Sequence, residues 1–166
     1  KRVVLASTVA VAALAVVGFA VAAPAPVAGA VPEKADNFQL TDHTRLSHEL
    51  YYFKDAKAVV LMTQTNGWAL SRTAAAELEK LKAAYKDKGV LFYMINSADS
   101  RDAAAAEAKS QGFDIPVLVD ELQLVGEQLG VQREGEVFVI DQQNGHKVAY
   151  HGPIDDRFTK SSPNVK

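Results

Sequence analysis

The sequence predicts an α/β fold, a three-layer α/β/α sandwich with a mixed central sheet, preceded by one N-terminal hydrophobic helix. Three observations lead to this prediction. Short apolar runs typical of buried strands alternate with amphipathic runs typical of helices. A strand, turn and strand pattern follows them, and a long uncharged apolar stretch stands at the start of the chain.

Residues 3–23, VVLASTVAVAALAVVGFAVAA, are apolar or small, and no charged residue occurs between Arg2 and Glu33. As a helix they would span roughly the 30 Å hydrocarbon core of a bilayer. The basic start and the small-residue sites AVA and AGA also fit a cleaved secretory signal peptide, so that alternative stays open. We expect residues 1–23 to be a signal-like transmembrane anchor in a bacterial cytoplasmic membrane. The positive-inside rule places its N-terminus inside and the domain in the periplasm, whereas a cleaved signal would make the domain secreted.

Residues 24–36, PAPVAGAVPEKAD, are rich in Pro and Ala and predict a linker. We expect a folded domain over residues 37–158 and a C-terminal tail over residues 159–166.

The first elements of the domain are strands. A short strand is expected over residues 37–42, and a turn of helix with a further extended piece over residues 45–53. Residues 58–63, AVVLMT, form a continuous apolar run bounded by polar residues, which predicts a buried central strand.

A long helix follows, with Ala74, Leu78, Leu81 and Tyr85 on its inner face and Gly89 as its stop signal. Residues 90–96, VLFYMIN, predict a second buried strand.

The remaining elements repeat this alternation. Ser100 or Asp102 can cap a helix that runs to Gly112. A strand over residues 115–120 and a short helix follow, and a hairpin is expected around the turn QQNG, because Asn-Gly favours a tight turn. The short helix, ELQLVGEQLG, is expected to turn three side chains inward, namely Leu122, Val125 and Leu129.

Composition excludes several functions. After Lys1 and Arg2, the chain has 16 basic and 20 acidic residues, a net charge of −4, and no basic stripe interleaved with aromatic residues, so no nucleic acid is expected as a partner. None of the 166 residues is cysteine. Disulfides, thiolate catalysis and cysteine metal ligands are therefore excluded.

Several separated segments together resemble a redoxin domain of the thioredoxin superfamily, in the peroxiredoxin-like and thiol-disulfide oxidoreductase branch. They are AVVLMT, VLFYMINSADSR, IPVLVDELQLVGEQLGV, EVFVID and GPIDDRF. The resemblance covers about residues 36–158 and implies a thioredoxin-like fold. It also implies a reactive cysteine in the loop between the first buried strand and the long helix, where the helix N-terminus stabilises a thiolate.

This chain departs from that pattern at the positions that would carry the chemistry. The loop positions read Thr65, Asn66, Gly67, Trp68 and Ala69, and Thr65 and Trp68 stand where the family has cysteine. A second departure is Gly135, which falls where thioredoxin-like domains hold a cis-proline facing the redox loop. These six residues are expected to form a degenerate redox loop without a catalytic residue.

Other chemistry finds little support in the sequence. Ser71 has no histidine near it in sequence and is expected to satisfy backbone N–H groups at the helix start. The histidines form two pairs spaced by five residues, a spacing that cannot chelate locally, so we expect surface histidines, no metal and no cofactor. Asp155, Asp156 and Arg157 are expected to form a salt bridge or, together with Trp68, a contact to a partner. Trp68 either fills the hollow of the lost cysteine or lies exposed as an interface anchor.

The leading hypothesis is a non-catalytic thioredoxin-like domain tethered to the outer face of the cytoplasmic membrane. It would serve as an accessory or structural subunit of a membrane protein complex, with other integral-membrane subunits as partners and the lipid bilayer around residues 3–23. A respiratory or photosynthetic assembly is the natural candidate. The alternatives are a redoxin-type oxidoreductase or peroxidase that works without cysteine, and a secreted peptide- or metal-binding module.

Overall fold

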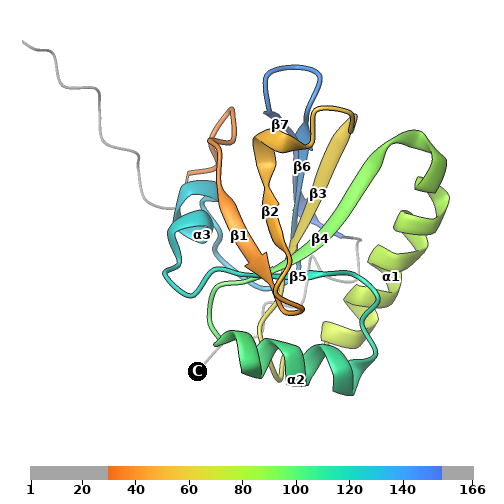
Figure 1. Ribbon diagram of the computed structural model, residues 1–166, viewed down its shortest axis with the longest axis vertical. Coiled ribbons are helices and arrows are strands. Elements are labelled where there is room, and N and C mark those ends of the chain that lie inside the picture. The colour runs from red at the N-terminus through yellow and green to blue at the C-terminus, as the bar shows by residue number, and fades with distance from the viewer. Residues whose placement is uncertain (1–29, 155–166) are drawn as a thin grey trace, which may run out of the picture.

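A computed structural model describes residues 30–154 as one mixed α/β domain (Figure 1). Its seven-stranded sheet has the order β2-β1-β5-β4-β3-β6-β7. The central strands β3, β4 and β5 are parallel to one another, and the remaining pairings are antiparallel. The strands are β1 (Gln39–Asp42), β2 (Ser47–Glu49), β3 (Ala58–Thr63), β4 (Val90–Asn96), β5 (Val117–Val119), β6 (Glu136–Asp141) and β7 (Lys147–Pro153).

Helices cover both faces of this sheet. Helix α1 (Ser71–Ala84) and helix α2 (Arg101–Gln111) pack on one face, together with side chains such as Met62 and Met94. Helix α3 (Leu124–Leu129) and the 3₁₀ turn η1 (Leu50–Tyr52) pack on the other face. A second 3₁₀ turn, η2 (Lys86–Lys88), follows α1. The predicted alternation of helices and strands around a mixed sheet is thus confirmed within the described residues, except for the order of elements in residues 45–53.

Strands β3 and β4 have the bounds that their apolar runs predicted, whereas β5 is shorter than the strand expected over residues 115–120. Five of the six residues of β3 are buried, and β3 pairs along its whole length with β4, from Ala58 opposite Val90 to Thr63 opposite Ile95. Both faces of these strands are covered, which explains why they are continuously apolar rather than alternating.

The predicted caps of α2 are confirmed, but the long helix α1 ends at Ala84 and not at the predicted stop, Gly89. The Ser100 hydroxyl accepts a hydrogen bond of 3.4 Å from the backbone N–H of Ala103 at the start of α2. Gly112 ends α2 with a left-handed φ of +72°, and Gly89 ends η2 with a φ of +74°.

Three expectations about orientation and order are wrong. In residues 45–53, strand β2 precedes the helical turn η1 instead of following it. Leu122 points outward and is 77% exposed, because α3 begins two residues after it. Leu81 and Tyr85 are 38% and 42% exposed, since they border an open apolar groove between α1 and the strands β3, β6 and β7.

The last residues of the stretch expected as a linker are part of the fold. Ala35 is fully buried, its N–H donates to the carbonyl of His146 at 2.9 Å, and the N–H of Val148 donates to the carbonyl of Glu33. The folded domain therefore begins before Asn37.

Within residues 30–154, no helix is long and apolar enough to cross a membrane. The anchor expected over residues 3–23, most of the linker and the tail expected over residues 159–166 lie outside the described residues.

Candidate functional site

The loop between β3 and α1 holds five of the six residues expected at a degenerate redox site. A turn from Thr65 to Trp68 is closed by a 3.3 Å hydrogen bond from the N–H of Trp68 to the carbonyl of Thr65. Gly67 lies in this turn with a φ of +74°, a backbone conformation that favours glycine. Ala69 is exposed at the end of the loop, just before α1.

Trp68 and Gly135 are in direct contact, although 66 residues separate them in the chain. A Cβ atom built on Gly135 would lie 2.7 Å from Cη2 of the Trp68 ring, closer than real Cβ atoms come. The indole is half-buried and packs against the core cluster between the sheet and the helices α1 and α2. The side chain at one presumed cysteine position thus lies against the residue that stands for the cis-proline.

The loop of residues 132–135 is held against the end of β3 by hydrogen bonds to Thr63. The N–H of Gly135 donates to the Thr63 carbonyl at 2.9 Å, and the Thr63 hydroxyl donates to the Arg133 carbonyl at 2.7 Å. The same hydroxyl accepts from the N–H of Glu136 at 3.0 Å. These bonds fix the distance between the two loops.

Glu136 is a buried carboxylate at the start of β6, behind the loop. It accepts a hydrogen bond from the N–H of Gln132 at 2.9 Å, and Arg133 Nε and His151 Nε2 each lie 3.4 Å from Oε1. A buried carboxylate needs such partners, so these contacts hold the loop of residues 132–135 in place.

A second polar network centres on Asn96, which is fully buried at the end of β4. Its Nδ2 lies 3.0 Å from Gln64 Oε1, 3.2 Å from Asn66 Oδ1 and 3.0 Å from Asp99 Oδ2. Its Oδ1 accepts from the N–H groups of Ala98 and Asp99. Asn96 therefore joins the β3–α1 loop to the loop that follows β4.

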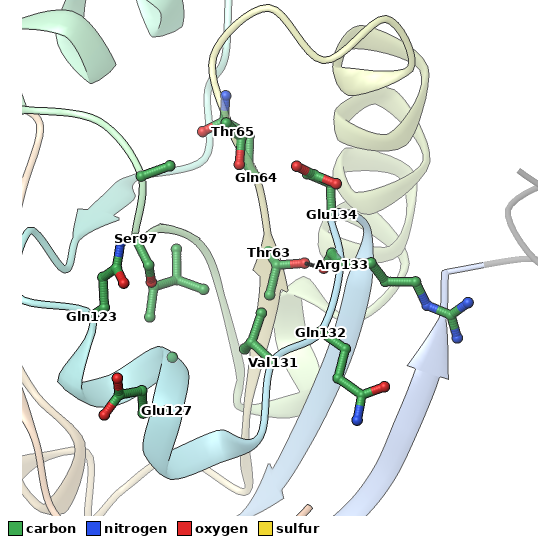
Figure 2. A pocket seen from close by; sticks show the side chains of 13 residues that line it. Thr63, Gln64, Thr65, Ser97, Gln123, Glu127, Val131, Gln132, Arg133 and Glu134 are labelled. Atoms are coloured by element: carbon green, nitrogen blue, oxygen red, sulfur yellow. Dashed lines mark hydrogen bonds between the residues drawn. The ribbon is translucent and has the colours of Figure 1, made fainter. Parts of the chain in front are cut away.

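A cavity of about 270 Å³ opens beside these loops, on the side of α3 (Figure 2). Its walls come from the ends of β3 and β4, from α3 and from the loop before β6. They are lined by Thr63, Gln64, Thr65, Ile95, Ser97, Ala98, Gln123, Gly126, Glu127, Val131, Gln132, Arg133 and Glu134. Figure 2 shows the Arg133 guanidinium directed away from the cavity, so Glu127 and Glu134 are the charged groups at its rim.

This lining does not assemble a nucleophile with a base. It contains hydroxyl, amide and carboxylate groups, but no histidine, lysine or cysteine. The Ser97 hydroxyl donates to Asp120 at 2.9 Å, but that carboxylate also accepts the N–H groups of Val125 and Gly126 at the start of α3. The hydroxyl, amide and carboxylate groups of this lining can bind a polar group by hydrogen bonds.

The other candidates from the sequence lie elsewhere. Ser71 begins α1, but its buried hydroxyl has no hydrogen-bond partner, so the expectation that it satisfies backbone N–H groups is wrong. His48 is not a surface residue, because it is bonded to Asp42 and its ring packs edge-on against Tyr93 at 5.0 Å. Asp155, Asp156 and Arg157 lie outside the described residues. In residues 30–154, no three His, Cys, Asp or Glu side chains are grouped to hold a metal ion.

Sequence reasoning missed the residues that hold the site together. Asn96 ends a buried parallel strand and Asp99 lies three residues beyond it, the position where α/β folds place binding residues, and this signal could have found them. Glu136 begins a predicted strand, and nothing in its sequence neighbourhood indicates that it is buried.

Comparison with known proteins identifies the family. Residues 31–151 match the AhpC/TSA family. The chain belongs to this family. A search of curated proteins found no match to the sequence.

Solved structures share the redoxin fold. An uncharacterized conserved protein from Geobacillus kaustophilus has 26% identity and a TM-score of 0.69, over 88% of this chain and 82% of that chain. A hypothetical protein from Sinorhizobium meliloti has 25% identity and a TM-score of 0.67, over 82% and 78% of the two chains. Peroxidoxin BcpB from Mycobacterium tuberculosis has 24% identity and a TM-score of 0.60, over 74% and 84%. The expected redoxin resemblance and the thioredoxin-like fold of the domain are thus confirmed.

Proposed function

We propose that this chain is a non-catalytic member of the AhpC/TSA family that acts as an accessory or structural subunit of a membrane protein complex. Residues 3–23 would tether it to the outer face of the bacterial cytoplasmic membrane. The observation that carries the proposal is the contact between Trp68 and Gly135 in a chain without cysteine. An indole takes the place where a redoxin needs sulfur.

The amino-acid composition is unsuited to thiol-based redox chemistry. Dithiol and peroxidatic mechanisms need a thiolate, and no side chain in this sequence can supply one. The β3–α1 loop is nevertheless kept in a defined conformation by Asn96 and Asp99, which both bond to Asn66. A domain that keeps its fold without its nucleophile is better suited to bind than to react.

The N-terminal sequence supports tethering to a membrane. Residues 3–23 are long enough and apolar enough to cross a bilayer, and the folded domain begins a few residues later. A small domain held at the membrane surface by one helix is suited to dock on neighbouring integral-membrane subunits. A respiratory or photosynthetic assembly stays the natural candidate for the complex.

The test of the non-catalytic part is a peroxide-reduction and disulfide-reduction assay on the full chain in detergent. We expect no turnover above the buffer rate. A Trp68→Cys variant serves as the matched comparison, because it restores a thiol at one presumed cysteine position. Turnover by the wild-type chain would overturn the proposal and favour a cysteine-independent oxidoreductase or peroxidase.

The test of the membrane part is purification from native membranes in mild detergent, followed by mass determination of the complex and of the intact chain. We expect co-purification with integral-membrane subunits and a chain that keeps residues 3–23. A free monomer contradicts the accessory role. A mature chain that begins near Pro24 or Val31 instead supports the secreted peptide- or metal-binding module.

A further inference from the structure

A slot of about 430 Å³ lies on the other side of α3 from the candidate site, between β1 and the start of α3. It exists because β1 and β5 pair only at Thr41 opposite Val119 and Asp42 opposite Leu118. Beyond Val119 the chain leaves the ladder to β1, while on its other side the N–H of Asp120 still bonds to the carbonyl of Asn96 in β4.

The interrupted ladder leaves the backbone of Gln39 facing this slot. Along β1, the main-chain groups of Phe38 and Asp42 bond toward β2, whereas His43 bonds to Val117 next to β5. Because these directions alternate along a strand, the N–H and carbonyl of Gln39 point to the β5 side. In this register they would pair with Glu121, but the pairing stops two residues earlier.

Two side-chain donors that line the slot have no acceptor. Arg101 Nε and Gln128 Nε2 are closed off from solvent, and neither has a hydrogen-bond partner. An unpaired buried donor is costly, so a ligand oxygen at this place would be favoured. Both side chains are half-buried as a whole, so a rotation of their ends can present the N–H groups to a ligand.

Apolar side chains stand beside these donors. Leu122 and Leu124 both line the slot and are 77% and 61% exposed. They flank Gln123, whose φ of +61° turns the chain sharply before α3 begins. Two exposed leucines next to unused hydrogen-bond groups indicate a contact surface rather than a simple surface turn.

The charges around the slot favour an uncharged ligand. Arg101 is the cation in the lining, and Asp120 and Glu121 are the anions. The Asp120 carboxylate accepts the N–H groups of Val125 and Gly126 at the start of α3, while Glu121 accepts the backbone N–H of Arg101 at 3.0 Å. The Glu121 carboxylate would repel a ligand carboxylate in the slot, whereas it would not repel a neutral carbonyl oxygen.

We propose that this slot binds an extended, uncharged peptide segment. Its main chain pairs with Gln39 where the ladder to β5 stops, one of its carbonyl oxygens accepts from Arg101 and Gln128, and an apolar side chain packs on Leu122 and Leu124. Addition of a strand to open backbone groups is an established mode of peptide recognition. The proposal depends neither on the absence of catalysis nor on a membrane partner.

The test is an NMR titration of the ¹⁵N-labelled full chain in lipid nanodiscs. The probes are N-acetyl-Ser-Leu-Ser-amide, the same peptide methylated on the leucine nitrogen, and N-acetyl-Ser-Glu-Ser-amide. We expect the leucine peptide to shift the Gln39 amide and the Arg101 and Gln128 side-chain N–H signals. The methylated and acidic peptides should bind at least about tenfold more weakly.

Variants locate the effect. Arg101→Met and Gln128→Leu should each weaken binding of the leucine peptide by about three- to tenfold. Arg72→Met, whose Nε is already bonded to Gln111, and Gln142→Leu, a second buried amide without a partner outside this slot, are the matched controls and should leave binding unchanged. Equal binding of the methylated peptide, no shift at the three named groups, or equal weakening by the controls would overturn the proposal.

Discussion

Trp68 and Gly135 form a pair in which each residue restricts the other. The ring occupies the space that a side chain at residue 135 would need, and Gly135 has a φ of +74°. Gly112 offers a comparison, since its φ is +72° but nothing lies within 4 Å of the position of a Cβ. Substitutions at these two glycines therefore distinguish the cost of backbone strain from the cost of contact with the indole.

We predict that Gly135→Ala destabilises the fold more than Gly112→Ala. The control should cost about 1 kcal/mol from the left-handed backbone, and Gly135→Ala about 1 to 3 kcal/mol more from overpacking. Urea unfolding of both variants measures the difference. In a Trp68→Ala background the extra cost should disappear, and an unchanged extra cost would show that the ring is not its cause.

Asp42 gives the second prediction at this scale. Burial raises the pKa of its carboxyl, but hydrogen bonds from His48, Thr44 and Leu46 outweigh burial and hold the pKa below the usual 3.8. The charged form is thus favoured in the folded state. Its contribution is present above the unfolded pKa and is lost as the pH falls below about 4.

We predict that Asp42→Asn lowers the free energy of unfolding by about 1 to 3 kcal/mol at pH 7. The gap to the wild type should narrow as the pH falls below about 4, as urea unfolding between pH 2.5 and 7 would show. Burial, and then the charge of Asp42, also raise the pKa of Tyr93 above 10.0, so loss of that charge should bring the Tyr93 pKa closer to 10.0. A gap that stays constant with pH would contradict the assignment.

Helix α1 shows how a helical pattern can identify an element and still misplace part of its surface. Ala74, Leu78, Leu81 and Tyr85 follow one stripe, as a packed helix requires. The first two are buried, but the last two border the apolar groove over β3, β6 and β7. The spacing of residues indicates which side of a helix is apolar, but not how far along the helix the neighbouring element extends.

The two leucines of this stripe should therefore respond differently to truncation. Leu78→Ala should destabilise the domain by about 2 to 5 kcal/mol, because it leaves a cavity in the core. Leu81→Ala should cost less than about 1 kcal/mol, because its side chain is partly in water already. Thermal and urea unfolding would measure both, and equal costs would mean that the groove is filled in solution.

Elements were predictable where local signals and tertiary packing agree. The run AVVLMT, the Ser100 cap and Gly112 each fix their element through chemistry within a few residues. Leu122 was wrongly expected to point inward, because the sequence does not indicate that Gln123 adopts a left-handed conformation and that α3 begins only after it. The order of β2 and η1 depends on pairing with β1, which is a tertiary contact.

For the molecule as a whole, the sequence predicted the thioredoxin-like fold but not the framework of contacts behind the β3–α1 loop. The assignment of Thr65, Trp68 and Gly135 as replaced positions stays a prediction, because it rests on the resemblance. Asn96 bonds to Asn66, 30 residues away, and the Thr63 hydroxyl bonds to the main chain of Arg133 and Glu136, 70 and 73 residues away. Such contacts leave no local pattern in a single sequence.

The extent of the domain gives the last prediction. Residues 30–36 contribute the buried Ala35, two main-chain bonds to the β6–β7 hairpin, and Val31 against the core. A chain that begins at residue 37 should melt about 4 to 8 °C below one that begins at residue 30. Circular dichroism melting of the two chains measures this, and equal melting temperatures would place the domain boundary at residue 37.

The pairing of Lys34 with Lys147 also bears on the order in which the domain is made. Glu33 and Ala35 leave the ribosome long before β7, the last strand to be synthesised. Their partners do not exist until nearly the whole domain has emerged, and closing so long a loop is slow compared with forming local contacts. In the folded domain, residues 33–35, which are synthesised first, thus pair with the outer edge of β7. This edge can be covered only after the whole sheet has been synthesised.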